Sequence, residues 1–117
     1  MQNFRNLRVW HAGKDFCIEM YRVTKSFPRE ELYGFTSQMR RAAHSICSNV
    51  AEGCGYLGNR DSARFYQMAF GSSSECHSDM YIAEELGLLS KAEFGRLERL
   101  LTPTRKQLLR LLEVTRR

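Results

Sequence analysis

Apolar residues recur at alternating intervals of four and three near the start of the chain. This spacing places them along one side of an α-helix, in the narrow seam that is typical of helix bundles. Pro28 ends the pattern, because a proline disfavours a helical conformation at the residue before it. We therefore predict a helix over residues 7–27 whose inward side consists of Val9, Gly13, Phe16, Met20, Val23 and Phe27.

Three further segments show the same helical period, and no segment shows the alternation of a strand. They predict helices over residues 35–53, 59–87 and 90–116. The expected inward side of the second is Phe35, Met39, Ala42, Ala43, Ile46, Cys47, Val50 and Ala51. That of the third is Phe65, Ala69, Ser73, Cys76, Met80 and Ala83, flanked by Phe70 and Leu86. That of the fourth is Phe94, Leu97, Leu101, Thr104, Leu108, Leu111 and Thr115.

Residues that favour helix ends lie at the expected boundaries. Gly53 and Gly55 suit the left-handed conformation that closes many helices, and Gly87 with Leu88 resembles a Schellman stop. Asn59 is a good first cap for the third helix, and Ser90 with Glu93 forms a capping box for the fourth. In the connection over residues 29–34, Leu32 and Tyr33 are candidate anchors. Pro103 interrupts the fourth pattern without changing its register, which predicts a kink.

Four helices joined by short loops predict one all-α domain over residues 1–117. An up-down antiparallel four-helix bundle is the simplest arrangement. A chain of 117 residues with 43% hydrophobic content can bury a core without a disulfide or a metal ion. No apolar run approaches the roughly 18 residues of a membrane span. The first residues lack the apolar segment of a signal peptide, so we expect a cytoplasmic protein without membrane contact.

The residues that carry metal or catalytic chemistry do not form a recognisable pattern. The four cysteines lack zinc-knuckle spacing, and three of them, Cys17, Cys47 and Cys76, fall at core positions where a thiol behaves as a small hydrophobe. The chain has no Glu-x-x-His pair of the kind that di-metal bundles use. Its histidines, His11, His44 and His77, lie on three different expected helices. We therefore predict no metal site, no cofactor and no catalytic residue.

The net charge of +5 belongs to the end of the sequence. Residues 1–95 carry equal numbers of basic and acidic side chains, whereas residues 96–117 carry seven basic and two acidic ones. Spacings of seven, four and seven place part of this surplus on one side of the fourth helix, as Arg99, Lys106, Arg110 and Arg117. Such a stripe is typical both of a solvated helix face and of a nucleic-acid contact.

Several motifs are similar to those of one protein family. The stretch Tyr33-Gly34-Phe35-Thr36-Ser37-Gln38-Met39-Arg40-Arg41-Ala42-Ala43 resembles the signature Y-G-L-T-S-Q-I-R-R-A-A, and residues 45–53 resemble S-I-P-S-N-I-A-E-G. Phe4 to Trp10 resembles an opening F-x-x-L-x-V-W, and residues 86–90 match a later position. Cys47 replaces a proline, which favours a straighter second helix. These motifs are typical of four-helix-bundle proteins encoded in intervening sequences of bacterial large-subunit ribosomal RNA genes.

The biochemical role of this family is poorly defined, and the resemblance bears chiefly on assembly. Members are similar to the accessory protein of diversity-generating retroelements, a ring of five bundles that binds a reverse transcriptase and nucleic acid. It thus implies a homo-oligomer with five subunits as the leading number. Phe4, Leu7 and Trp10 are our first candidates for the contact surface between copies.

Two hypotheses follow for the function. The first is a self-assembling interaction module. The alternative is a nucleic-acid-binding accessory protein that uses the basic fourth helix. Near the motif's end, Ser48, Asn49 and Glu52 are expected to bond backbone groups at the turn rather than to perform chemistry.

Overall fold

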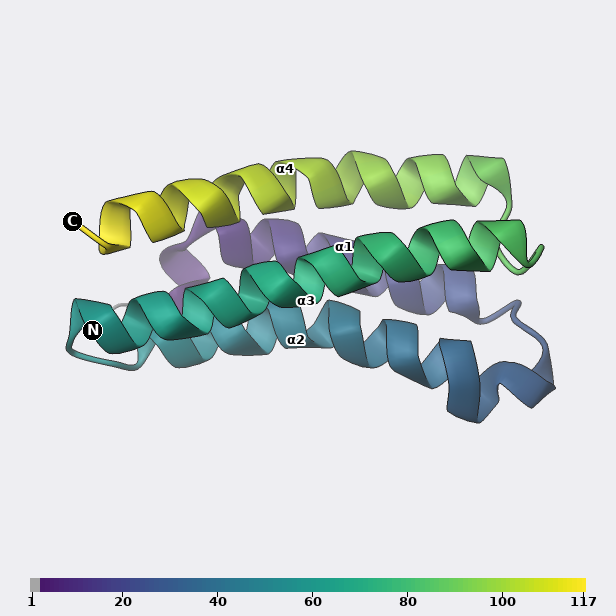
Figure 1. The fold of residues 1–117 in the computed structure, drawn as a ribbon, viewed down its shortest axis with the longest axis horizontal. Coiled ribbons are helices and arrows are strands. Elements are labelled where there is room, and N and C mark those ends of the chain that lie inside the picture. The colour runs from purple at the N-terminus through teal and green to yellow at the C-terminus, as the bar shows by residue number, and fades with distance from the viewer. Residues whose placement is uncertain (1–2) are drawn as a thin grey trace.

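A computed structural model of the chain describes residues 3–117 and consists of four long helices (Figure 1). They are α1 (Arg8–Thr24), α2 (Ser37–Cys54), α3 (Asn59–Glu85) and α4 (Lys91–Thr115). Short helical turns lie at Phe4–Asn6, Arg29–Glu31 and Leu32–Thr36, and residues 3–117 contain no strand. Within the same range, no helix is both long enough and apolar enough to cross a membrane. The predicted helical bundle is confirmed.

The helices form an antiparallel square in which each one packs against two neighbours. The close pairs are α1 with α2, α2 with α3, α3 with α4, and α4 with α1. Helices α1 and α3 therefore stand at diagonally opposite corners and run in the same direction (Figure 1). The short connections over residues 55–58 and 86–90 make α2, α3 and α4 consecutive antiparallel neighbours.

The predicted inward sides largely form the core. All six predicted residues of the first seam are buried, and Met39, Ile46, Met80 and Leu97 are fully enclosed. Two positions are corrected. Tyr66 is buried where Phe65 was expected, and Leu112 is buried where Leu111 was expected. Leu86, expected beside the inward stripe, is 60% exposed.

The junction between α2 and α3 differs from the prediction. Gly53 lies inside α2 in helical geometry, and Gly55 has a φ of −78°, so neither adopts the left-handed conformation. Gly53 instead permits close packing, because a Cβ atom there would lie 2.5 Å from the ring of Tyr66. The Ser62 hydroxyl donates a 2.8 Å hydrogen bond to the Gly53 carbonyl, which holds the two helices together. The cap of α3 is Gly58, one residue before the predicted Asn59.

The junction between α3 and α4 agrees with the prediction. Gly87 has a φ of +77°, and the Leu88 amide donates to the Ala83 carbonyl, as in a Schellman stop. Ser90 and Glu93 bond to each other's backbone amides in the predicted capping box. Helix α4 continues through Pro103, which faces solvent, so the unpaired carbonyl one turn earlier can bond to water.

The connection from α1 to α2 forms an exposed corner. Leu32 and Tyr33 were expected to anchor it, but they are 45% and 93% exposed. The backbone leaves helical geometry at Gly34, and the Glu31 carboxylate accepts a hydrogen bond from the Phe35 amide. This polar bond holds the corner, since its large side chains contribute little buried area.

Candidate nucleic-acid interface and apolar surface patches

The net positive charge of the protein lies in one half of the bundle. Contacts of Gly13 with Ile46 and Thr104, and of Ser45 with Ser72, mark the middle. One side of this level, which we call the basic half, comprises residues 3–12, 48–70 and 105–117. It carries three acidic residues, Glu52, Asp61 and Glu113, and nine basic ones, Arg5, Arg8, Arg60, Arg64, Arg105, Lys106, Arg110, Arg116 and Arg117.

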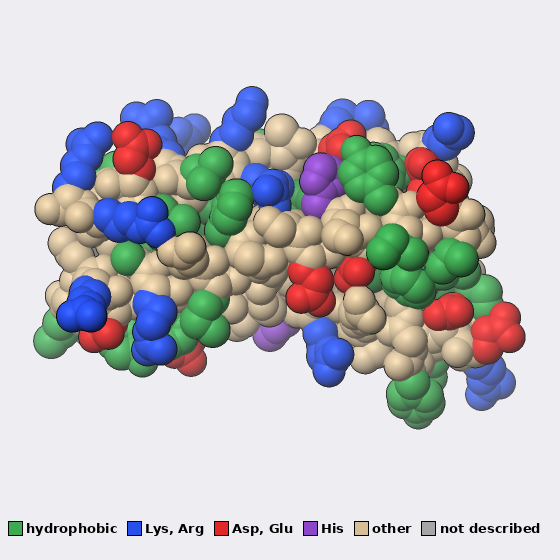
Figure 2. Space-filling model, in the orientation of Figure 1, with side chains coloured by type: hydrophobic (Ala, Val, Ile, Leu, Met, Phe, Trp, Pro, Cys, Tyr) green, Lys and Arg blue, Asp and Glu red, His purple; other side chains and the backbone are tan. Residues whose placement is uncertain are grey.

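The opposite side, which we call the neutral half, carries the remaining nine basic and ten acidic residues. Figure 2 shows the resulting concentration of Lys and Arg on the left and of acidic groups on the right. The surplus is therefore not a property of the fourth helix alone. Folding adds basic residues from the chain start and from α3, and it places Arg96 and Arg99 in the neutral half.

The predicted stripe on α4 is exposed along its length but is divided by the fold. Lys106, Arg110 and Arg117 line a shallow groove in the basic half, whereas Arg99 lies beyond the middle. Glu113 lies in the same groove, 3.6 Å from the Arg117 guanidinium. This carboxylate reduces the positive potential near the C-terminal end of the stripe.

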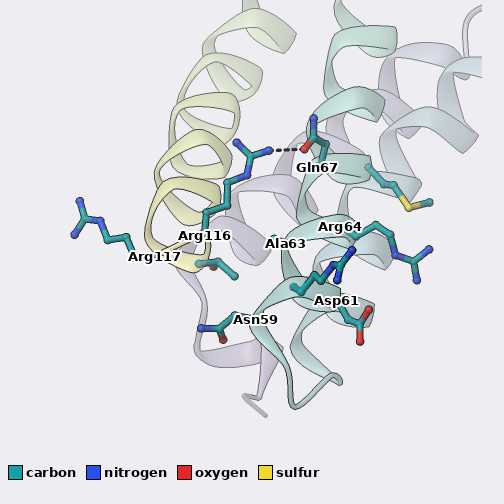
Figure 3. A pocket seen from close by; sticks show the side chains of 10 residues that line it. Asn59, Asp61, Ala63, Arg64, Gln67, Arg116 and Arg117 are labelled. Atoms are coloured by element: carbon teal, nitrogen blue, oxygen red, sulfur yellow. Dashed lines mark hydrogen bonds between the residues drawn. The ribbon is translucent and has the colours of Figure 1, made fainter.

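A second basic groove lies between the start of α3 and the end of α4. It is lined by Arg60, Arg64, Arg116 and Arg117, with Asp61 as its only acidic residue (Figure 3). The Arg116 guanidinium donates a hydrogen bond to the Gln67 side chain, and Arg64 extends outward. Arg60 and Arg64 were not among the predicted nucleic-acid contacts. Their spacing of four residues was a signal that they share a helix face, but not that this face adjoins α4.

The three residues proposed for contact between copies pack against their own chain. Phe4, Leu7 and Trp10 are half-buried, and the rings of Phe4 and Trp10 lie 4.9 Å apart. They cover the edge of the core at the start of α1. Their role in an interface stays a prediction.

In the neutral half, exposed apolar side chains lie on two opposite corners. On α1, Ile18 and Tyr21 are 52% and 42% exposed and border a groove with α2. On α3, Ile82 and Leu86 are 46% and 60% exposed, and Tyr81 lies beside them. Because α1 and α3 are diagonal in the bundle, the two groups face away from each other.

The thiols are not placed as nucleophiles or metal ligands. All four cysteines are free, and residues 3–117 contain no cluster of three or more metal-ligating side chains. Burial raises the pKa of the Cys47 thiol to about 12 and also raises the pKa of Cys17. Both shifts favour the protonated thiol, which is the less nucleophilic form.

Residues 48–52 bond to the backbone, though not at the predicted place. The Asn49 amide and the Ser48 hydroxyl both donate to the Ser45 carbonyl, one helical turn earlier, at 2.9 and 3.4 Å. Glu52 is exposed on the surface of α2. These bonds lie within α2 and do not involve the turn that follows it.

Comparison with known proteins identifies a family over most of the chain. The family model described as the 23S rRNA-intervening sequence protein matches residues 5–110. This match includes all of α1, α2 and α3 and most of α4. No curated protein matches the chain.

Proposed function

The chain belongs to the 23S rRNA-intervening sequence protein family, and we propose that it acts as a non-catalytic module that assembles with copies of itself. The family description states where such proteins are encoded and names no activity. The proposal is supported chiefly by one observation, the exposed apolar side chains on outward helix faces. Clustered exposed apolar groups are typical of interaction surfaces.

The apolar groups on α3 are the clearest case. Met68, Ile82 and Leu86 are 48%, 46% and 60% exposed, although the opposite side of the same helix is buried in the core. A helix that needs only one neighbouring core has apolar residues on one side and polar ones on the other. Helix α3 has apolar residues on both sides, which favours a second packing partner for its outward face.

The proposed lack of catalytic activity rests on the surroundings of the histidine and cysteine side chains. The His11 ring lies 2.8 Å from the Arg5 carbonyl, and His77 lies 3.0 Å from the Glu98 carboxylate, so they serve separate local contacts. A nucleophilic thiol requires a lowered pKa, but the pKa of Cys17 and that of Cys47 are raised. A hydrolysis or group-transfer activity that depends on one of these histidines or cysteines would contradict the proposal that the module is non-catalytic.

Light scattering on the purified chain at micromolar concentration tests self-assembly. We expect a mass several times that of one chain, with five subunits the leading number because of the family resemblance. A mass of one chain across this range would reject the proposal. Measurements at low and high salt should agree in subunit number if apolar contacts dominate.

A second candidate function, nucleic-acid binding, is supported by the charge of the basic half. Nine basic and three acidic residues lie there, and two grooves on either side of the α4 end display them. Such a concentration of arginine and lysine attracts a phosphate backbone without reading its sequence. The residues lining the two grooves include no aromatic ring on which a base could stack, so we expect little sequence discrimination.

The test is a salt titration with a mixed-sequence duplex. Each phosphate neutralised should add about one unit to the slope of log affinity against log salt concentration. Changing Lys106 and Arg110 together to Gln should lower this slope, and so should changing Arg60 and Arg64. Arg29→Gln with Lys91→Gln, which removes the same charge from the neutral half, is the matched control. An unchanged slope in both groove variants, or no binding at low salt, would exclude this function.

A further inference from the structure

Two apolar patches in the neutral half carry opposite charges. The α1 patch consists of Ile18 and Tyr21, with Arg22 and Lys25 at its edge. The Arg40 guanidinium lies 4.7 Å from the centre of the Tyr21 ring and adds a further positive charge. Two acids adjoin this patch: Glu19 is buried and bonded to two arginines, and Asp15 is exposed and lies 3.6 Å from the Lys14 ammonium group. The surface that the α1 patch presents is therefore apolar and basic.

The α3 patch has the opposite character. It consists of Ile82 and Leu86, with Glu75 and Glu85 on the same outward face of the helix. Glu75, Ile82 and Leu86 share this face because they are seven and four residues apart, and Glu85 is three residues from Ile82. Residues 65–90 contain no lysine or arginine. The surface that the α3 patch presents is therefore apolar and acidic.

The two patches lie on the same side of the middle of the bundle. Both lie in the neutral half, residues 18–25 near the end of α1 and residues 75–86 near the end of α3. The two helices run in the same direction and stand at opposite corners (Figure 1). Ile18 and Tyr21 are five and eight residues beyond Gly13, whereas Ile82 and Leu86 are 10 and 14 residues beyond Ser72. At 1.5 Å per residue, the α3 patch is about 8 Å further from the middle. A parallel second copy shifted by about that distance along the long axis therefore brings the α1 patch of one copy to the α3 patch of the other.

We infer that the α1 patch of one copy docks on the α3 patch of the next, in a head-to-tail contact that can continue around a ring. This inference rests on the proposed self-assembly and names the surfaces that perform it. Contacts between two α1 patches or between two α3 patches place like charges together, which opposes a two-fold symmetric dimer. A contact between unlike patches leaves one of each free, so it adds subunits: the assembly is a ring where the rotation between copies closes and an open filament where it does not.

Two matched double variants test this pairing. Ile18→Asp with Tyr21→Asp removes the α1 patch, and Ile82→Asp with Leu86→Asp removes the α3 patch. All four side chains are 42–60% exposed, so the helices should remain folded, as circular dichroism can verify. Each variant alone should have the mass of one chain in light scattering. An equimolar mixture should have the mass of two chains, because one intact patch of each kind remains.

The control replaces two equally exposed apolar residues outside both patches. Leu109 and Val114 on α4 are 52% and 53% exposed, and changing both to Asp should leave the assembly at its wild-type mass. Loss of assembly in this variant alone would place the interface on α4 and overturn the inference. Patch variants that assemble like the wild type, or that stay single chains when mixed, would also overturn it. A wild-type chain that is itself monomeric would instead reject the proposed self-assembly.

Discussion

Gly53→Ala should destabilise the bundle, although alanine is the better helix former. The added Cβ atom would lie 2.5 and 2.8 Å from two ring carbons of Tyr66 and 3.1 Å from the Ser62 carbonyl oxygen. The ring is held in place, because Tyr66 is 4% exposed and its hydroxyl lies 3.5 Å from the Cys54 sulfur. Neither the ring nor the backbone can move away without separating α2 from α3.

The expected loss follows from two opposing terms. Overpacking a core costs about 1–3 kcal/mol, and replacing a helical glycine by alanine returns about 1 kcal/mol. Because the added Cβ meets an enclosed ring and backbone, we expect an overpacking cost in the upper part of its range. The free energy of unfolding should therefore fall by about 1–2 kcal/mol in total. For a domain of this size, that lowers the melting temperature by roughly 4–8 °C.

Urea unfolding followed by circular dichroism, at one fixed protein concentration, measures this loss. Gly95→Ala is the matched control, since its Cβ would meet only the Arg99 guanidinium at 3.5 Å; it should raise stability by up to about 1 kcal/mol. In a Tyr66→Leu background the cost of Gly53→Ala should fall, because the opposing ring is gone. A Gly53→Ala protein as stable as the wild type would refute the packing argument.

Three further predictions concern one carboxyl group, three thiols and one exposed tyrosine. Burial raises the pKa of the Asp79 carboxyl, although two hydrogen bonds from the Gln38 side chain act to lower it. The native state therefore binds the carboxyl proton more tightly than the unfolded state does. As a result, the free energy of unfolding falls as pH rises from the ordinary pKa through the raised one. Asp79→Asn should then stabilise the protein at pH 7, and pH-dependent melting should show the gain disappearing below the ordinary aspartate pKa of 3.8. With the pKa of Cys47 near 12 and with Cys54 and Cys76 buried, a thiol reagent at pH 8 should label these three at least tenfold more slowly in the native than in the urea-unfolded protein. Tyr33→Ala should change the free energy of unfolding by less than about 0.5 kcal/mol, because Tyr33 is 93% exposed, and a larger loss would show a contact that the corner lacks.

The sequence predicted the helices well because their period is a local property. The intervals of three and four residues place Val9 to Phe27 on one side of α1 whatever that helix packs against. The two misplaced core residues show where this information ends. Phe65 and Tyr66 are adjacent and aromatic, and both are near the inward direction. Tyr66 is the buried one because Gly53, on another helix, leaves space for its ring.

The candidate sites could be predicted only in part, because each one combines distant segments. Counting charge along the chain assigned the surplus to residues 96–117, since that count groups sequence neighbours. The fold brings together residues at the same position along the long axis of the bundle. Arg60 therefore lies in one groove with Arg116, whereas Arg99 lies in the other half. The patches on α1 and α3 depend in the same way on knowing that these helices are diagonal.

The two proposed functions become linked if the inferred contact is correct. A head-to-tail contact between parallel copies points every basic half toward the same side of the assembly. A long nucleic acid could then reach several copies at once, and linked weak contacts raise the overall affinity greatly. The variant Ile18→Asp with Tyr21→Asp retains every residue of the basic half but should be a single chain. It should therefore bind a duplex of 40 or more base pairs far more weakly than the wild type does, and the salt dependence of its affinity should be smaller. Its affinity for a duplex of about 10 base pairs should change little, because such a duplex is too short to bridge two copies. Equal loss on both duplexes would show that the α1 patch itself contacts nucleic acid, and equal retention on both would show that assembly does not contribute to binding.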